Sequence, residues 1–267
     1  MAVRERRPNA HISIWARREE AVEEIRLRKI AGFASTDLKA VAADADLVVF
    51  CVPIGMMGPL AEKMAGFVSP DALITDVGSV KTPVVESLGR IFSGRARFVG
   101  SHPMAGSEQT GLDAAHASLF EGAVCIVTPG KNSTPEDVEA LRQFWTMLGG
   151  QPRILSPAEH DEVIALVSHL PHLIAATLVN LVCAQNPNSL NFCGNGFRDT
   201  TRVASGSPGM WTEIFGGNRE QLKKSIHAMI EKLQEAVRLI DDDAKMQEFL
   251  AGAKAQRDRL KRGNKNG

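Results

Sequence analysis

The sequence predicts an α/β protein in which an open parallel sheet is followed by an all-helical region, and three observations support this. Apolar segments with strand character alternate with helical patterns through residues 1–157. The segment 46–52 is apolar almost throughout, as in parallel strands that are buried on both faces. Ser156-Pro157-Ala158-Glu159 forms a capping box, after which the patterns are helical. We therefore expect one domain at residues 1–157 and a second at residues 158–267.

The individual elements follow from hydrophobic period and capping residues. Strands are expected at residues 11–16, 46–52, 72–75, 97–100, 123–127 and 151–155. Helices are expected at residues 19–30, closed by Gly32, at 56–64, and at 134–148, ended by Gly149-Gly150. Shorter helices should begin at the cap Thr36 and at Thr82-Pro83.

The composition excludes several classes of partner. Lys and Arg number 31, and so do Asp and Glu, so the basic excess of a nucleic-acid-binding protein is absent. No apolar run approaches the ~20 residues needed to cross a bilayer, and the N-terminus has no signal-peptide pattern. We expect a cytoplasmic protein without nucleic-acid or membrane partners. The four cysteines lack metal-binding spacing and should be buried structural thiols rather than disulfides: Cys51, Cys125, Cys183 and Cys193.

One strand that a nucleotide-binding sheet needs is absent from the sequence. Such a sheet opens with a strand and a G-x-G-x-x-G turn, whose amides hold the pyrophosphate of the cofactor. The chain contains no such turn, and residues 1–8 have the pattern of the helix that would follow it. We expect Met1 to be an internal methionine of a longer protein. Residues 1–157 would then form a Rossmann-type sheet without its first strand.

Polar or turn-forming residues follow three of the expected strands. They are Val52-Pro53, the segment 76–81 and Ser101-His102-Pro103, and the carboxyl ends of parallel strands share one edge of a sheet. His102 is the candidate for proton transfer, since histidine titrates near neutral pH; the alternative is a loop-capping histidine. Ser79 would orient His102 or bond a substrate hydroxyl, or else it lies in the turn before a helix. We expect Val52, Pro53 and Ser79 to contact a cofactor.

The residues after the first expected strand indicate which dinucleotide binds. An acidic residue at this place holds the ribose hydroxyls of NAD, whereas an arginine accommodates the 2′-phosphate of NADP. The chain has Arg17 and Arg18 here, which favours NADP over NAD. The alternative is a basic pair that opens the helix continuing with Glu19-Glu20.

The helical half contains two polar patterns. Asp161, Ser168 and His172 recur at offsets that place them on one stripe of an otherwise apolar helix, lining either a ligand cleft or an internal hydrogen-bond network. Arg198 and Arg202 are four residues apart and suit a dicarboxylate substrate, unless they form a solvated face with Asp199. His169 and His172 lack a third ligand at plausible spacing, so no metal is expected.

The last part of the chain repeats apolar residues at near-heptad spacing. These residues are Leu222, Ile226, Met229, Leu233, Val237 and Ile240. Such spacing indicates packing within the domain or a dimer interface. The polar, basic tail at residues 261–267 should be disordered.

The motifs together resemble the prephenate and arogenate dehydrogenases of tyrosine biosynthesis. Their order and spacing match across almost the whole chain, which makes the resemblance specific. They are Asp76-Val-Gly-Ser-Val-Lys81, His102-Pro-Met-Ala-Gly-Ser-Glu108, His160-Asp161, Ser168-His-Leu-Pro-His172 and Gly196-Phe-Arg-Asp-Thr-Thr-Arg202 with Met210-Trp211.

The resemblance implies a function and a set of roles. It implies a Rossmann-type domain, a helical domain that forms a homodimer, and oxidative decarboxylation of prephenate to 4-hydroxyphenylpyruvate or of arogenate to tyrosine, with NADP or NAD. By motif position the catalytic histidine falls on His102, the assisting serine on Ser79 and the carboxylate-binding arginine on Arg202. Positions that line or support the pocket fall on Arg198, His172, Glu108, Asp161 and Trp211.

Two other functions compete with this one. A β-hydroxyacid dehydrogenase has a similar sheet and helical domain, but the chain lacks an obvious catalytic lysine in a glycine-led helical motif. A non-catalytic dimeric remnant, without nucleotide binding, is disfavoured by the presence of His102, Ser79 and Arg202. The sequence does not distinguish prephenate from arogenate, because no residue clearly demands the ammonium group of arogenate.

Overall fold

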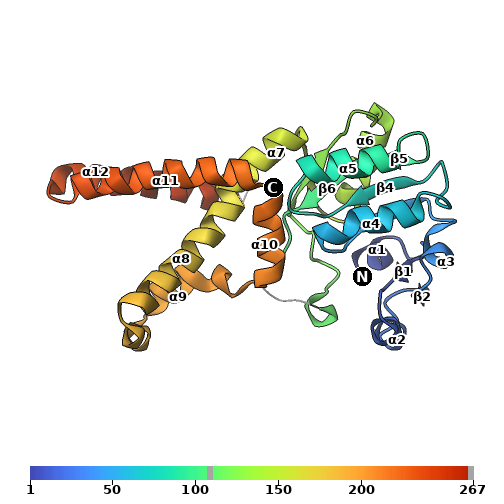
Figure 1. Ribbon diagram of the computed structural model, residues 1–267, viewed down its shortest axis with the longest axis horizontal. Coiled ribbons are helices and arrows are strands. Elements are labelled where there is room, and N and C mark those ends of the chain that lie inside the picture. Colours follow the sequence, from blue (N-terminus) through green and yellow to red (C-terminus); the bar gives the residue numbers. More distant parts are fainter. Residues whose placement is uncertain (107–110, 264–267) are drawn as a thin grey trace. The chain divides into compact units, whose positions relative to one another are not determined.

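The computed structural model describes residues 1–106 and 111–263, and the chain forms two compact units, Met1–Asn218 and Arg219–Gly267 (Figure 1). Within the first unit, strands give way to helices at Pro157. The domain boundary expected at this point lies inside that unit and stays a prediction.

The strands of the first unit form three short ladders. They are β1 (Ser13–Trp15), β2 (Phe33–Ser35), β3 (Leu47–Phe50), β4 (Leu73–Asp76), β5 (Arg97–Phe98), β6 (Gly100–Pro103), β7 (Val124–Thr128) and β8 (Gln151–Ile154). The ladders run in the orders β1-β2, β3-β4-β5 and β6-β7-β8. Only Val99 separates β5 from β6, and its amide donates to the Ile74 carbonyl at 3.0 Å. The second ladder therefore leads directly into the third.

Helices of the first unit precede, connect and follow these strands. Those of the α/β part are α1 (Ala2–Arg6), α2 (Glu19–Leu27), α3 (Leu38–Ala42), α4 (Ile54–Met64), α5 (Thr82–Ile91), η1 (Leu112–Ala114) and α6 (Pro135–Met147). The helical part consists of α7 (Pro157–Ile164), η2 (Ala165–His169), α8 (Leu170–Gln185), η3 (Pro187–Phe192), α9 (Asn195–Thr201), η4 (Arg202–Ser205) and α10 (Pro208–Gly217).

Both faces of the central strands are covered, as the apolar pattern predicts. In β4, Ile74 packs into a cluster with residues of α4 and α5, whereas the adjacent Leu73 packs into a second cluster with residues of α6. Neighbouring residues of a strand point to opposite faces, so an apolar residue is needed at each position. In the second cluster Trp145 is buried and has edge contacts with Phe120 and Phe144. The predicted α/β class is confirmed.

Three local expectations are corrected by the structure. Phe33–Ser35 pairs in parallel with β1 and was not expected as a strand, because three residues are too few to show a period. Helix α3 is capped by Asp37, whose side chain accepts from the amides of Lys39 and Ala40, and not by Thr36. Strand β6 is antiparallel to β7, so the sheet is not wholly parallel.

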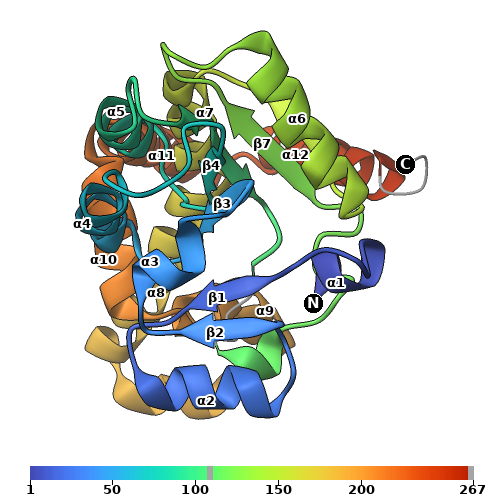
Figure 2. The same ribbon diagram turned by 90° about the vertical axis from the view of Figure 1, so that its right-hand side faces the viewer.

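The first ladder stands apart from the rest of the sheet. Figure 2 shows β1 and β2 side by side, and among the described residues no strand pairing joins them to β3 or β4. The expectation that a further strand precedes this chain is neither supported nor excluded by this arrangement and stays a prediction.

The cysteines differ in part from expectation. All four are free thiols, as predicted, and Cys125 is buried. Cys183 and Cys193 are half-buried, and Cys51 is exposed at the end of β3. Cys51 therefore does not fill the core.

The long helix from Pro157 to Gln185 contains a π-helical segment, η2. Pro171 lies two residues beyond its end; it lacks an amide hydrogen and its ring crowds the preceding turn, which favours such a bulge. The bulge changes the helical phase, so the buried polar residues are His160, Asp161, His169 and His172. Ser168, expected on this stripe, is only half-buried.

This helix also corrects the expectation on apolar runs. By length and composition, with a mean hydropathy of 1.6, it is long and apolar enough to cross a membrane. Core helices of globular proteins can have the same length and composition. His160 and Asp161, near its N-terminal end, hydrogen-bond to residues of the α/β part, so that end of the helix belongs to the protein core, while 33% of the apolar window is buried.

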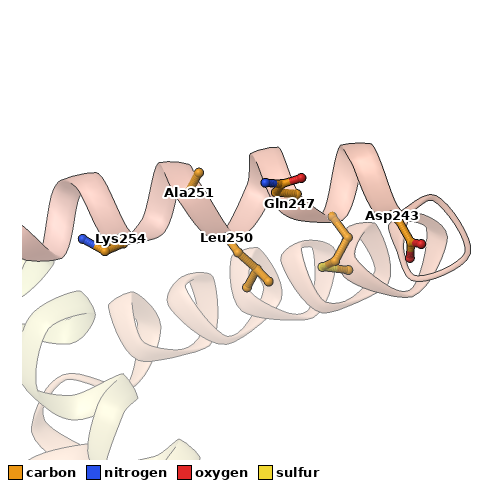
Figure 3. A pocket seen from close by; sticks show the side chains of 6 residues that line it. Asp243, Gln247, Leu250, Ala251 and Lys254 are labelled. Atoms are coloured by element: carbon orange, nitrogen blue, oxygen red, sulfur yellow. The ribbon is translucent and has the colours of Figure 1, made fainter.

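The second unit consists of α11 (Arg219–Leu239) and α12 (Asp243–Gly263). A groove of about 560 Å³ runs along α12 beside α11 and is drawn in Figure 3. It is lined by Asp243, Met246, Gln247, Leu250, Ala251 and Lys254. None of these residues was a candidate site residue. Of the tail expected to be disordered, residues 261–263 belong to α12, and residues 264–267 lie outside the described residues.

Candidate active site

A chain of buried side chains links His102 to a carboxylate. Nδ1 of His102, on β6, lies 2.9 Å from Nε2 of His160 on α7. Nδ1 of His160 lies 2.8 Å from Oδ1 of the adjacent Asp161. His102, His160 and Asp161 are 7%, 0% and 3% exposed. The arrangement is that of a base oriented by a second histidine, which is oriented in turn by an acid.

The carboxylate end of this chain is fixed by backbone donors. Asp161 accepts from the Lys81 amide at 2.7 Å and from the Thr82 amide at 2.8 Å. These are the first amides of α5, which has no side-chain cap of its own. Burial would raise the pKa of Asp161, but hydrogen bonds from His160 and Thr82 outweigh it and hold the pKa below its ordinary value. Asp161 is therefore ionised at neutral pH.

An ionised Asp161 determines the proton positions in the chain. Because a carboxylate only accepts, Nδ1 of His160 must donate to it, which leaves Nε2 of His160 as an acceptor. Nδ1 of His102 then donates to His160. Nε2 of His102 is the nitrogen that takes no part in this chain, and in this tautomer it carries a lone pair.

The environment of His102 favours its neutral form. Burial lowers the pKa of His102 well below its ordinary value, and the nearby His160 and Lys81 lower it further. Asp161 acts in the opposite direction but is outweighed. Hence His102 is unprotonated at neutral pH, as a general base must be.

Beside this chain lies a cluster of aromatic rings from α8 and α10. The rings of His172 and Trp211 are stacked, with centroids 3.6 Å apart and an interplanar angle of 16°. A Cβ on Gly206 would lie 2.5 Å from Nε1 of Trp211 and 3.1 Å from Cε1 of His172, so this position requires glycine. His169 and Phe215 meet Trp211 at a tilt or edge.

Two polar atoms in this cluster are buried without a partner within the described part of the chain. They are Nδ1 of His172 and Nε2 of His169. The other nitrogen of His169 lies 3.3 Å from Nδ2 of Asn218, which donates to the Asp161 carbonyl at 2.7 Å. Burial lowers the pKa of His172, and it lowers the pKa of His169 to about 4. Neutral imidazoles with unpaired nitrogens are groups that a bound ligand would satisfy.

The two arginines lie on adjoining helical segments. Arg198 lies on α9 and Arg202 at its C-terminal cap; both side chains are exposed. The following turn, η4, packs against α8, the helix that bears His172. The binding role of the pair stays a prediction.

The expected cofactor residues follow three strand ends. Arg17 and Arg18 follow β1 and are exposed; Val52 and Pro53 follow β3. Ser79 lies in the turn after β4 and is half-buried. In the part of the chain that the structure describes, no hydrogen bond joins the Ser79 hydroxyl to His102, so the expected orienting contact is not observed.

One candidate, Glu108, lies outside the described residues. No group of three potential metal ligands occurs among the residues that are described.

Three residues of the site were missed by the sequence analysis. His160 was named only as part of a motif and was given no role. Lys81 and Asn218 were not singled out, because neither belongs to a periodic pattern of polar residues. Asn218 bonds Asp161 across 57 positions, and His160 bonds His102 across 58. The only signal for His160 was that it precedes Asp161, since a histidine beside a buried acid tends to be its partner.

The fold and site together define a class of protein. A sheet covered by helices on both faces, with a buried, unprotonated histidine on one of its strands, is typical of dinucleotide-dependent dehydrogenases.

Comparison with known proteins gives the family. Residues 1–167 match the family model described as prephenate dehydrogenase, nucleotide-binding domain, and residues 156–255 match prephenate dehydrogenase, dimerization domain. Cyclohexadienyl dehydrogenase of Zymomonas mobilis is 32% identical over 256 residues, covering 93% of this chain and 87% of that protein. Prephenate dehydrogenase of Bacillus subtilis is 35% identical over 246 residues, 90% of this chain and 64% of its own length.

A solved structure agrees with these matches. Prephenate dehydrogenase of Aquifex aeolicus, in complex with hydroxyphenyl propionate and NAD+, has a TM-score of 0.90 and 30% identity, covering 97% of this chain and 92% of that chain. The chain belongs to the prephenate dehydrogenase family. It is an oxidoreductase of tyrosine biosynthesis whose N-terminal part is a nucleotide-binding domain.

The buried neutral histidines predict a pH dependence of stability. His169 binds a proton below about pH 4 in the folded chain but below ~6.5 when unfolded. Its contribution to the free energy of unfolding is therefore complete above ~pH 6.5 and is lost as the pH falls toward 4, by up to ~1.4 kcal/mol per pH unit.

Urea unfolding between pH 7 and pH 4 measures this slope. His169→Gln should show a shallower fall than the parent chain. The matched control His11→Gln changes an exposed histidine and should leave the slope unchanged. Equal slopes in the parent and His169→Gln would contradict the assignment.

Proposed function

We propose that the chain oxidises and decarboxylates prephenate or arogenate, with His102 as the general base. The observation that carries this is the buried chain from His102 through His160 to Asp161, which leaves Nε2 of His102 as the basic atom. Prephenate would give 4-hydroxyphenylpyruvate and arogenate would give tyrosine.

His102 would act on the ring hydroxyl of the substrate. Its Nε2 takes the hydroxyl proton, and the imidazolium that forms is stabilised through His160 by the charge of Asp161. When bound, the nicotinamide accepts the hydride from the hydroxyl-bearing carbon. The bond from the ring to its carboxylate then breaks, carbon dioxide leaves, and the electron pair makes the ring aromatic. The ring oxygen recovers a proton, which His102 is placed to return.

The remaining predicted residues would bind the substrate. Arg202 and Arg198 supply guanidinium groups for the two carboxylates. Nδ1 of His172, which has no partner in the described part of the chain, would also hydrogen-bond to the substrate. The stacked rings of His172 and Trp211 would pack against the ring of the substrate. Ser79 would bond the substrate hydroxyl. Glu108 completes the proposed pocket by motif position alone.

The residues that follow the strand ends are placed to bind parts of a dinucleotide cofactor. We propose NADP as the preferred cofactor and NAD as the weaker one, because Arg17 and Arg18 are exposed after β1, where the ribose phosphate would lie. Val52, Pro53 and Ser79 would contact the nicotinamide end. No residue of the chain forms the glycine-rich turn that would hold the pyrophosphate.

We also propose a cytoplasmic homodimer formed through the helical domain. The C-terminal family model is described as a dimerization domain. On α11, Leu233 and Val237 are 57% and 69% exposed, and apolar side chains exposed at near-heptad spacing favour helix pairing.

His102→Asn tests the proposed base. It keeps a polar side chain but removes the basic nitrogen, so kcat should fall ~10²–10⁴-fold while cofactor affinity stays the same. Turnover is followed by the absorbance of the reduced nicotinamide, with prephenate and with arogenate. His116→Asn, at an exposed position, is the control. Near-normal turnover by His102→Asn would reject the assignment, and no reduction by the parent chain with either substrate and either cofactor would contradict the proposed function.

Arg17→Ser with Arg18→Ser tests the cofactor preference. Losing charge-assisted hydrogen bonds of ~1.5–3 kcal/mol should raise the Kd for NADP about 10-fold or more and leave that for NAD nearly unchanged. Fluorescence titration with each dinucleotide gives both constants. Arg90→Ser, in the last turn of α5, is the control. Tighter binding of NAD than NADP by the parent chain would overturn the preference.

Light scattering tests the dimer. The purified chain should have twice the 28.9 kDa mass of one copy. Replacing Leu233 and Val237 by Glu should shift the mass toward that of one copy while circular dichroism stays unchanged. A single-copy mass for the parent at micromolar concentration would count against the proposal.

A further inference from the structure

Lys81 is a fully buried lysine that the proposed chemistry does not use. Its side chain is 0% exposed, and a buried ammonium is costly unless it is paired and hydrogen-bonded. The Lys81 ammonium donates to Oδ2 of Asp76, which is also fully buried, and to the carbonyl of Ser101 at 2.8 Å. Burial lowers the pKa of Lys81, and the Asp76 carboxylate opposes that effect.

The Ser101 carbonyl is the group next to His102 in the chain. Ser101 is held from two further directions, since its hydroxyl donates to the Asp76 carbonyl at 2.7 Å and its amide donates to Oδ1 of Asp76 at 3.3 Å. Lys81 and Asp76 therefore clamp the peptide group that sets the position of the His102 ring on β6.

The backbone of Lys81 is also linked to His102, through Asp161 and His160. Its amide donates to Oδ1 of Asp161, the same oxygen that accepts from His160. One residue thus anchors the strand that carries the base and the carboxylate that orients it. The ammonium hydrogen-bonds to Asp76 and to Ser101. It is therefore not placed to act on the substrate itself.

We propose that the Lys81 side chain positions His102: it holds the Ser101 carbonyl next to the imidazole-bearing residue and, through its buried positive charge, disfavours a further positive charge on that ring. The role of His102 as base rests on the proposed function. The charged and titratable groups that act on His102 are His160, Lys81, His169 and Asp161. Among them Lys81 carries the ammonium group, which is paired with Asp76.

A purely structural role is a weaker explanation of this pair. Replacing a buried ion pair by uncharged groups of similar size is often neutral or stabilising, so stability alone does not call for it. What an apolar residue would not supply is a fixed charge beside the base. The distinguishing readout is therefore the titration of His102 itself.

Lys81→Met removes the charge and keeps the length of the side chain. The double variant Lys81→Met, Asp76→Asn removes both charges and keeps one acceptor oxygen, for the amide of either Gly78 or Ser101, in case the single variant leaves Asp76 unpaired and does not fold. Lys39→Met makes the same change at an exposed position and is the control.

NMR titration of histidine-labelled protein measures the His102 midpoint directly, with its signal assigned by comparison with His102→Asn. We expect the midpoint to rise by about one pH unit when the charge is lost, since a like charge nearby shifts a pKa by roughly this amount or more. The acid limb of kcat/KM should move to higher pH by the same amount, and kcat should fall about 10-fold or more because the ring is displaced.

The outcomes separate this proposal from the proposed function. A folded Lys81→Met variant with the parent's His102 midpoint would overturn the role of Lys81, as would a folded double variant with both the parent's midpoint and the parent's kcat. A shifted midpoint supports it, whatever the activity. A parent chain without activity contradicts the proposed function, while the NMR titration still decides the question of Lys81.

Discussion

The carboxylate of Asp161 is the group on which the rest of the site depends. It accepts from the first two amides of α5, it fixes the tautomer of His160, and the backbone carbonyl of the same residue accepts from Asn218. The same side chain thus attaches the helical part to the α/β part and orients the histidine that hydrogen-bonds to His102. Because buried donors need an acceptor, an apolar residue at this position would leave them unpaired.

Local features of the fold were predictable from the sequence because their causes are local. The capping boxes at Thr134 and Ser156 are both present, and the apolar run at β3 does lie in a doubly covered sheet. Strand β2 was missed because its pairing with β1, and not its own pattern, makes it a strand. Likewise the antiparallel pairing of β6 follows from the path of the chain after Val99, which no residue pattern encodes.

For the candidate site, the sequence indicated His102, the proposed base, but not the residues that hydrogen-bond to it or to its neighbours. His102 stood out because it follows a strand in a dense polar segment. His160 did not, since it acts through a partner distant in the chain. Lys81 did not either, because only its burial distinguishes it from an ordinary surface lysine. The polar stripe on the long helix was displaced because the π segment before Pro171 breaks the assumed period.

That π segment has a consequence for how this helix can vary in length. Residues 165–169 contain one residue more than a regular α-helix needs to span the same distance. Removing one residue there would restore regular geometry and leave His160 and His172 on their present faces. Removing one from the regular turn after Asp161 would instead rotate everything beyond it by about 100°, carrying His172 away from Trp211. The irregular turn is therefore the place between the two histidines where the chain can shorten by a residue and still keep the end that bonds His102 in phase with the end that stacks on Trp211.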